Sequence, residues 1–450
     1  IKKFQDGLPV LCDPTAGWAN CADNNLGQHI PIAVADTTTF TPANGFSMEA
    51  DYYVIAIVQH REQMSSSLPT AGSLLREYVQ LETPSNASFS KHIALMNDLQ
   101  NGTSVPALMP DGSQAYAVDD PHNLGPVIVA AKDRAVRIVF YNLLPTGLDG
   151  NLFLPVDSSM MGSGMGPSGM AAPADQGTVL DGIRNPDCTQ TPKAADCYTD
   201  NRATLHLHGG TTPWISDGTP HQWITPANET TMWPEGVSVA SVPDMTNPAI
   251  QALGVPDCSA ATDGCMTFYY TNEQSARLMF YHDHSWGITR LNVYAGGAAG
   301  YMITDPTEQK LINSGIIPAD QIPLIIEDKT FVPDTAQMAA ADPTWDYSRW
   351  GSYGDLWYSH VYMPAQNPGD PSGMSMYGRW FYGPWFWPPS TPVHDKIHNP
   401  YFNMDPATNF TTPLAVPCDL NNPASWQYQV SPYCEPEWIP GTPNISVGME

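Results

Sequence analysis

The fold is decided by the stretch Leu205-His206-Leu207-His208-Gly209-Gly210 and by its later counterpart, Tyr281-His282-Asp283-His284. Each stretch holds a His-x-His. Side chains alternate between the two faces of an extended strand, so histidines two residues apart point the same way. Imidazole is a ligand suited to copper, zinc, iron and nickel. Histidines also fall two residues apart by chance, but two such pairs with apolar or aromatic neighbours favour a metal site.

Short runs rich in β-branched and aromatic residues lie on either side of these stretches. Such runs predict strands, which we place at 52–60, 124–131, 135–144, 266–270, 279–284 and 299–304, with a helical turn at 286–292. The 44 prolines and 35 glycines predict many turns and long loops between them. Short strands at this spacing are typical of an all-β Greek-key sandwich.

The charge balance limits the partners of the chain. Its 450 residues carry 45 acidic and 18 basic side chains, a net charge of -27. This charge argues against nucleic acid or anionic lipid as a partner and would attract cations. Apolar runs are all too short for a membrane-spanning helix, so we predict no membrane span. The length is enough for two or three domains.

The eight cysteines fall into near-neighbour couples: Cys12 and Cys21, Cys188 and Cys197, Cys258 and Cys265, Cys418 and Cys434. None has the Cys-x-x-Cys spacing of zinc ribbons or of thioredoxin-like proteins. Four couples favour four short-loop disulfides and hence an extracytoplasmic location, either secreted, periplasmic or at the cell surface. The alternative is a set of free thiols in the core of a cytosolic enzyme.

The residues that follow the histidine pairs carry a family resemblance. Ser216-Asp217-Gly218 follows the first pair, and 289–296 and 299–303 follow the second. From about Phe4 to about Phe331 the chain resembles the multicopper oxidases, most closely the branch of spore-coat laccases and bilirubin oxidases. The resemblance implies a cupredoxin-like Greek-key β-sandwich with long loops and insertions. It suggests an N-terminal arm at 1–50, a first cupredoxin-like domain at 51–335, and a Trp- and Pro-rich connector at 336–450 that leads to a second cupredoxin domain outside this chain.

The same resemblance implies a role for each histidine. His206 corresponds to a ligand of the type 2 copper, and His208, His282 and His284 to ligands of the type 3 pair. Asp217 corresponds to a catalytic carboxylate beside the copper cluster, although the same Asp-Gly would also suit a plain turn. The implied reaction reduces O₂ to water at a trinuclear copper cluster. The reductant would be a small phenol or a metal ion such as Cu(I), Mn(II) or Fe(II).

Two further copper motifs of the family are missing from the sequence. The chain has no His-Pro-x-His-x-His, and none of its cysteines stands beside a histidine. A type 1 copper site needs a thiolate, so we expect none in this chain. We interpret the chain as the front portion of such an oxidase and expect a second polypeptide or a C-terminal fragment to supply the remaining ligands.

Two segments depart from the family pattern. Met160–Met170 holds four methionines among glycine, serine and proline. Thioether is a soft ligand suited to Cu(I), so this loop either handles copper or is simply an adaptable, low-complexity loop. Trp345–Trp387 is rich in aromatic residues and could form either a subunit or domain interface or a separate aromatic core of its own. We interpret His360, His394 and His398, in or after it, as surface histidines.

Two other functions remain open from the sequence. The chain could be a copper-binding or structural part of a larger extracellular assembly that has no turnover of its own. It could also be a metallohydrolase that binds zinc through the four histidines, although such sites usually add a carboxylate that activates water.

Overall fold

The computed structural model describes residues 1–154, 197–341 and 351–357, together with 156, 162, 347, 396–398, 403, 412–413 and 438–440. The chain divides into two compact units. The first comprises 1–151, 201–230 and 234–327, and the second comprises 152–200, 231–233 and 328–450. The four histidines of the two motifs all belong to the first unit.

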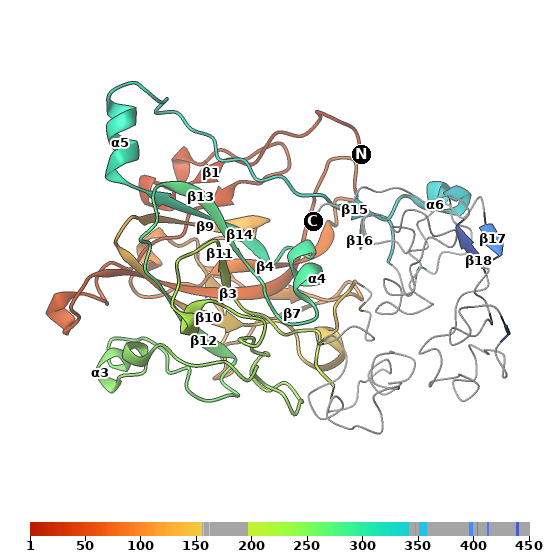
Figure 1. Cartoon of the computed structure of the whole chain (residues 1–450). Coiled ribbons are helices and arrows are strands. Elements are labelled where there is room, and N and C mark those ends of the chain that lie inside the picture. Colours follow the sequence, from red (N-terminus) through yellow and green to blue (C-terminus); the bar gives the residue numbers. More distant parts are fainter. Residues whose placement is uncertain are drawn as a thin grey trace. The chain divides into compact units, whose positions relative to one another are not determined.

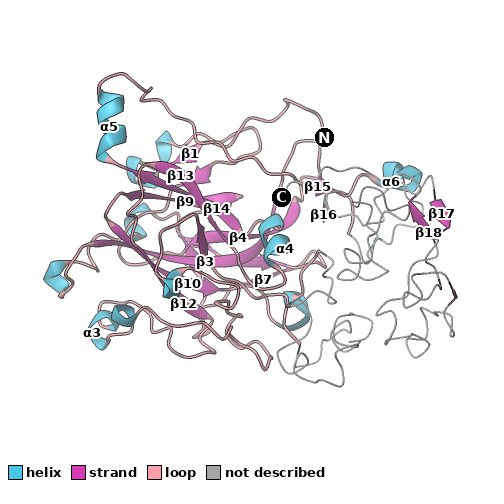
Figure 2. Ribbon diagram, in the orientation of Figure 1, coloured by secondary structure: helices cyan, strands magenta, loops and turns pink. Residues whose placement is uncertain are grey.

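Two four-stranded sheets form the first unit (Figures 1 and 2). The first sheet has the order β12-β10-β3-β4, with β12 at Cys265–Tyr270, β10 at Ala135–Asn142, β3 at Ala50–Glu62 and β4 at Ser73–Gln80. The second has the order β11-β13-β14-β9, with β11 at His206–His208, β13 at Arg277–His282, β14 at Ala298–Thr304 and β9 at Leu124–Ala131. Strand β10 runs parallel to β3, and β14 runs parallel to β9; the other neighbours are antiparallel.

Each unit also contains shorter elements. In the first unit they are β1 (Leu11–Cys12), β2 (Ile30–Pro31), β5 (Ile93–Ala94), β6 (Met96–Asp98), β7 (Ser104–Pro106), β8 (Tyr116–Ala117), α3 (Pro248–Gln251), α4 (Thr289–Tyr294) and α5 (Pro306–Asn313). In the second unit they are β15 (Thr330–Phe331), β16 (Leu356–Trp357), α6 (Thr335–Ala341), β17 (Lys396–His398) and β18 (Trp438–Pro440).

Strand β3 shows why the sequence forms a sandwich. Alternate residues of its apolar run point to opposite faces. Tyr53, Ile55 and Ile57 pack into a core cluster with side chains of both sheets, such as Phe140 and Tyr281. The alternate set packs into a second cluster on the other face of the strand: Tyr52, Val54, Ala56 and Val58. Burial on both faces explains the nearly unbroken hydrophobic run.

The fold is all-β, a cupredoxin-like Greek-key sandwich with long loops, as the sequence predicted. Five predicted strands have the observed bounds to within a few residues: β3, β9, β10, β12 and β14. The predicted strand at 279–284 lay two residues too far toward the C-terminus, because β13 spans Arg277–His282 and His284 lies in the loop that follows. The two histidines of the second motif therefore do not share a strand.

Two of the predicted disulfides are confirmed, Cys12–Cys21 and Cys258–Cys265. Cys197 is also disulfide-bonded, while Cys188, Cys418 and Cys434 lie outside the described residues. Met160–Met170, apart from Gly162, and most of Trp345–Trp387 lie outside them too. In the part of the chain that the structure describes, no helix is long and apolar enough to cross a membrane.

Candidate metal centre

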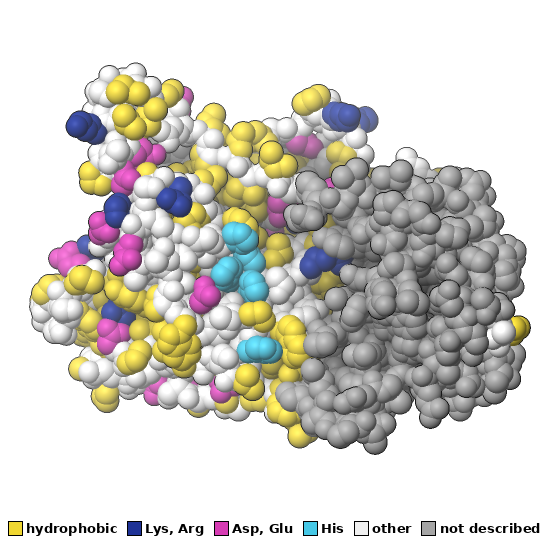
Figure 3. Space-filling model, in the orientation of Figure 1, with side chains coloured by type: hydrophobic (Ala, Val, Ile, Leu, Met, Phe, Trp, Pro, Cys, Tyr) yellow, Lys and Arg dark blue, Asp and Glu magenta, His cyan; other side chains and the backbone are white. Residues whose placement is uncertain are grey.

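The two histidine motifs meet at one edge of the second sheet. Strand β11 is the edge strand, and its register with β13 places His206 opposite His282 and His208 opposite Phe280. Leu207 and Tyr281, which are also opposite each other, point into the core and are fully buried. Alternation therefore leaves the histidines on the outer side of the strands. Histidine side chains gather on the face of the molecule drawn in Figure 3.

The four imidazole rings lie close together. The ring centre of His206 is 5.9 Å from that of His208, 5.3 Å from that of His282 and 4.8 Å from that of His284. Nδ1 of His208 lies 3.1 Å from Nε2 of His282. One nitrogen from each of His206, His208 and His282 lies within 4.8 Å of the other two. Although His284 is not in β13, the turn after the strand brings its ring back to the others.

Hydrogen bonds to backbone carbonyls set the orientation of two rings. Nδ1 of His206 donates to the carbonyl oxygen of Asp217 at 2.5 Å, and Nδ1 of His282 donates to that of Asp283 at 2.6 Å. Each ring then carries its lone pair on Nε2, the atom left to bind a metal. Burial and the three neighbouring imidazoles lower the pKa of His282 to about 4, although its backbone hydrogen bond opposes the shift. His282 is therefore neutral near pH 7, the form that binds metals.

His284 gives an independent indication of a missing ligand. Its Nδ1 is buried and has no hydrogen-bond partner. Buried polar atoms are nearly always satisfied, so an orphaned imidazole nitrogen beside three other imidazoles calls for a bound group. A copper ion would satisfy it, because imidazole suits copper. The residues present thus fit the metal that the motifs imply.

Asp217 lies beside the first pair, and its contact with His206 is made mainly by the backbone. The nearest carboxylate oxygen is 3.6 Å from Nδ1 of His206. The carboxylate accepts a hydrogen bond from Thr212 Oγ1 at 3.0 Å, and 40% of the side chain is exposed. The side chain is thus close enough to influence His206 and still reaches solvent.

Gly218 allows this loop to approach β11. Its φ is +66°, a conformation that favours glycine. A Cβ at this position would lie 1.8 Å from the carbonyl oxygen of Leu205. No other residue could bring the carbonyl of Asp217 to His206 by this path.

Sequence reasoning gave Asp283 no role. Its carboxylate is fully buried and accepts four hydrogen bonds, from Thr204 N, Ser285 N, Ser285 Oγ and Asn292 Nδ2. Thr204 precedes the first motif and Asn292 lies on α4, so Asp283 joins the segments that carry both pairs. Burial raises the pKa of Asp283, and the four hydrogen bonds oppose the shift. An Asp followed two residues later by Ser is a turn signal that could have marked it.

Comparison with known proteins gives sequence matches to copper oxidases. A laccase of Bacillus subtilis (strain 168) is 33% identical over 135 residues, which cover 30% of this chain and 20% of the laccase. A laccase of Bacillus stratosphericus is 29% identical over 221 residues, which cover 49% of this chain and 30% of that laccase. A bilirubin oxidase of Albifimbria verrucaria is 48% identical over 65 residues, which cover 14% of this chain and 11% of the oxidase. The matches thus span a third or less of the length of these relatives. No family model matches the chain.

Solved structures give only a weak likeness. A variant of the McoA multicopper oxidase from Aquifex aeolicus has a TM-score of 0.30 at 16% identity, covering 68% of this chain and 35% of that one. This score is too low to support any argument about the chain. Over part of its length the chain is thus similar in sequence to laccases and a bilirubin oxidase, and the matches agree with the two histidine motifs that converge on one edge of the sandwich.

Proposed function

We propose that this chain supplies one half of the ligands of a trinuclear copper cluster in an oxidase that reduces O₂ to water. The observation that carries the proposal is the convergence of four imidazoles, one of which has a buried nitrogen without a partner. Following the family resemblance, His206 would bind the type 2 copper, and His208, His282 and His284 the type 3 pair. Bound copper would supply the one-electron redox chemistry.

The surrounding residues would hold these ligands in their binding form. The backbone carbonyls of Asp217 and Asp283 fix the protons of two imidazoles on Nδ1, which leaves Nε2 for the metal. The carboxylate of Asp217 is partly exposed and 3.6 Å from His206. In this place it could take up a proton from solvent and pass it toward the cluster, which is the catalytic role that we propose for it.

We further propose that the cluster is completed by protein outside these 450 residues. Four imidazoles are too few for three copper ions, and a type 1 site needs a thiolate. The described Cys12, Cys21, Cys197, Cys258 and Cys265 are all disulfide-bonded, and the sequence has no cysteine next to a histidine. The remaining ligands would come from a further domain of the same polypeptide or from a second chain.

The reductant that we propose is a small phenol or a metal cation such as Cu(I), Fe(II) or Mn(II). The net charge of -27 supports a cation, because a negative surface raises the local concentration of positive ions. Disulfides support an extracytoplasmic location, since they persist in oxidising compartments.

Copper loading of the purified 450-residue chain tests the proposal. We expect the chain to bind copper with nitrogen ligands, measured by electron paramagnetic resonance and metal analysis. The double variant H206A/H208A should lose this copper. The matched control is H92A, which removes an exposed histidine whose side chain contacts only Glu82 and Tyr116 among the interactions described.

The same preparation separates the alternatives. Reduction of O₂ should require the missing part of the protein. An intense blue thiolate-to-copper band and O₂ reduction by the chain alone would contradict the ligand count. Copper binding without O₂ reduction in the complete native protein would instead favour a structural, copper-binding chain. Tight binding of zinc alone, with hydrolytic activity, would favour a metallohydrolase.

A further inference from the structure

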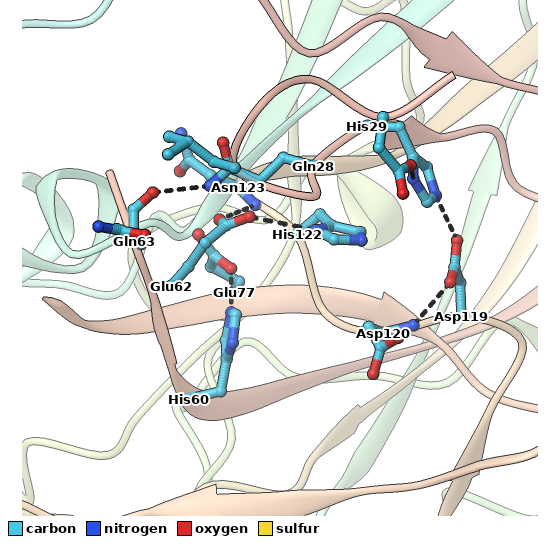
Figure 4. A network of polar contacts seen from close by, with 12 residues as sticks. Gln28, His29, His60, Glu62, Gln63, Glu77, Asp119, Asp120, His122 and Asn123 are labelled. Carbon is cyan, nitrogen blue, oxygen red and sulfur yellow. Dashed lines mark hydrogen bonds and ion pairs between the residues drawn. The ribbon is translucent and has the colours of Figure 1, made fainter. Parts of the chain in front are cut away.

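A second group of histidines and carboxylates lies elsewhere in the first unit (Figure 4). One ligand atom from each of His29, Asp119 and His122 lies within 4.8 Å of the other two. All three side chains are largely shielded from solvent, with exposed fractions of 4%, 5% and 11%. The three residues come from the N-terminal arm and from the loop between β8 and β9. None of them belongs to the four-histidine centre.

Each of the two imidazoles is oriented by a carboxylate of its own. Nδ1 of His29 lies 2.8 Å from Oδ1 of Asp23, and Nδ1 of His122 lies 3.1 Å from Oε1 of Glu62. Glu62 is itself held by the backbone N–H of Asn123 at 2.8 Å. Carboxylates that accept the Nδ1 proton and leave Nε2 to bind are the usual outer ligands of metal-bound histidine. His29 and His122 both have this arrangement, and one ligand atom of each lies within 4.8 Å of the other and of an oxygen of Asp119.

Asp119 provides the third ligand. Its Oδ2 lies 2.7 Å from Nε2 of His29, and its Oδ1 lies 2.6 Å from Nζ of Lys91. The ammonium of Lys91 also stands 4.0 Å above the ring of Trp18, which keeps it on the outer side of Asp119. Oδ2 is thus the oxygen that contacts His29, and a metal ion could replace the proton that the two groups share.

The charges of the group also favour a cation. Three carboxylates, those of Asp23, Glu62 and Asp119, contact the two imidazoles, and Lys91 is the one ammonium bonded to them among the described residues. The rings of His29 and His122 are only 4.7 Å apart, so one ion near Asp119 could contact both rings. The excess of carboxylates around this point would attract a cation.

We propose that His29, Asp119 and His122 bind a divalent transition-metal ion, with zinc as the best match. Two imidazoles and one carboxylate suit zinc, whereas magnesium and calcium prefer oxygen ligands alone. Ligands of a tetrahedral ion at about 2.0 Å stand roughly 3.3 Å apart, so His29 and Asp119 need to separate only slightly. Water can take the fourth position, because His29 also lines a cavity of about 610 Å³.

The ion would fasten the N-terminal arm to the sandwich. His29 and Asp23 belong to the arm, Glu62 ends β3, and His122 stands just before β9. Three segments that are distant in the sequence would thus share one metal-centred contact. Removing the ion should loosen the arm while the four-histidine centre remains in place.

Titration with Co(II), a spectroscopic substitute for zinc, tests the site on the full chain. The background is H206A/H208A, which disables the four-histidine centre, after circular dichroism has shown that it is folded. We expect one equivalent of Co(II) to give visible d–d bands that zinc abolishes. Adding H29A/H122A should remove the bands. Adding H92A instead, which removes an exposed histidine paired with Glu82, should leave the bands unchanged.

Two milder measurements keep the test valid if H29A/H122A does not fold. E62Q retains all three ligands and should weaken Co(II) binding by about 10–100-fold, the usual effect of losing an outer carboxylate. In the unmodified chain, zinc should slow proteolysis within residues 1–50. The proposal is overturned if H206A/H208A binds no Co(II), or if the same chain with H29A/H122A added is folded and binds Co(II) equally well. It is also overturned if E62Q leaves the Co(II) affinity unchanged and zinc leaves the rate of proteolysis within residues 1–50 unchanged.

Discussion

The carboxylate of Asp283 accepts four hydrogen bonds, all of them from N–H or O–H donors. D283N would place an NH₂ group against some of these donors, so that buried groups lose their partner. We expect the free energy of unfolding to fall by about 3 kcal/mol. Copper affinity of the four-histidine centre should fall as well, because the turn that carries His284 would be released. Urea denaturation and copper titration measure the two effects.

The control for D283N is D133N. Asp133 is 67% exposed and has a φ of +64°, a conformation that asparagine also tolerates. Its ion pair with Lys132 is at the surface, where such pairs contribute little. D133N should therefore leave both stability and copper affinity nearly unchanged. Equal losses in the two variants would mean that Asp283 has no special role.

The contact between His60 and Glu77 should make the free energy of unfolding depend on pH. Its Nε2 contacts a carboxylate oxygen of Glu77. Burial alone would lower the pKa of His60, but the charge and hydrogen bond of Glu77 outweigh burial and raise the pKa. The charged pair therefore contributes its full stability below the unfolded pKa of about 6.5. That stability is lost as the pH rises through the higher folded pKa.

H60Q should remove this dependence. The difference in free energy of unfolding between the native protein and H60Q should shrink as the pH is raised from about 6 to about 9. Urea denaturation at several pH values measures it. H92Q, at an exposed histidine, should run parallel to the native curve. A difference that stays constant, or grows with pH, would show that His60 is not charged in the folded state.

At the scale of elements, the three-residue strand β11 depends on the loop packed against it. Gly218 and Gly102 both have positive φ, +66° and +81°. A Cβ on Gly102 meets nothing within 4 Å, whereas one on Gly218 meets the carbonyl oxygen of Leu205. We expect G102A to cost about 1–2 kcal/mol from backbone strain alone. G218A should cost at least about 3 kcal/mol and should weaken copper binding, because β11 must move.

Thermal denaturation and copper titration of G218A and G102A separate strain from steric conflict. Equal destabilisation of the two variants would mean that the loop moves freely away from β11.

Most strands were predictable because burial enforces a local pattern. The run in β3 is apolar on both faces, and the alternation Leu205, Leu207 against His206, His208 gives the orientation of β11 directly. The end of β13 was not predictable in the same way. Asp283 bonds to the backbone N–H of Thr204, which is distant in the sequence. The local Asp-x-Ser signal indicates a turn near Asp283, but the tertiary contact with Thr204 is not visible in the local sequence.

For the whole molecule, the two proposed metal sites differ in how much of each can be predicted from the sequence. The four-histidine centre combines two local motifs, so its members could be named before the structure was known. The group of His29, Asp119 and His122 has no short spacing that covers all three residues. Only the packing of the arm against the loop before β9 brings them together, with Glu62 and Asp23 as orienting groups.

The net charge of -27 also acts at the scale of the whole molecule. In the oxidase to which we propose this chain belongs, we expect the KM for a cationic reductant such as Fe(II) to rise with ionic strength, because salt screens the attraction over about 10 Å at 0.1 M. The KM for a neutral phenol should change little. Steady-state kinetics over a range of salt concentrations checks this expectation. The same change for both reductants would show that the surface charge does not concentrate cations at the site of oxidation.

The parallel pairing of β9 with β14 has a consequence for synthesis on the ribosome. Residue 130 is paired with residue 303, so β9 leaves the exit tunnel long before its neighbour has been translated. During that interval the edge of β9 that pairs with β14 has no partner strand and could be bound by chaperones or aggregate. Force measurements on stalled nascent chains should detect no folding of the sandwich until Thr304 has emerged. An earlier folding signal would mean that β9 and its neighbours are stable without β14, and the emerging chain would then need less protection.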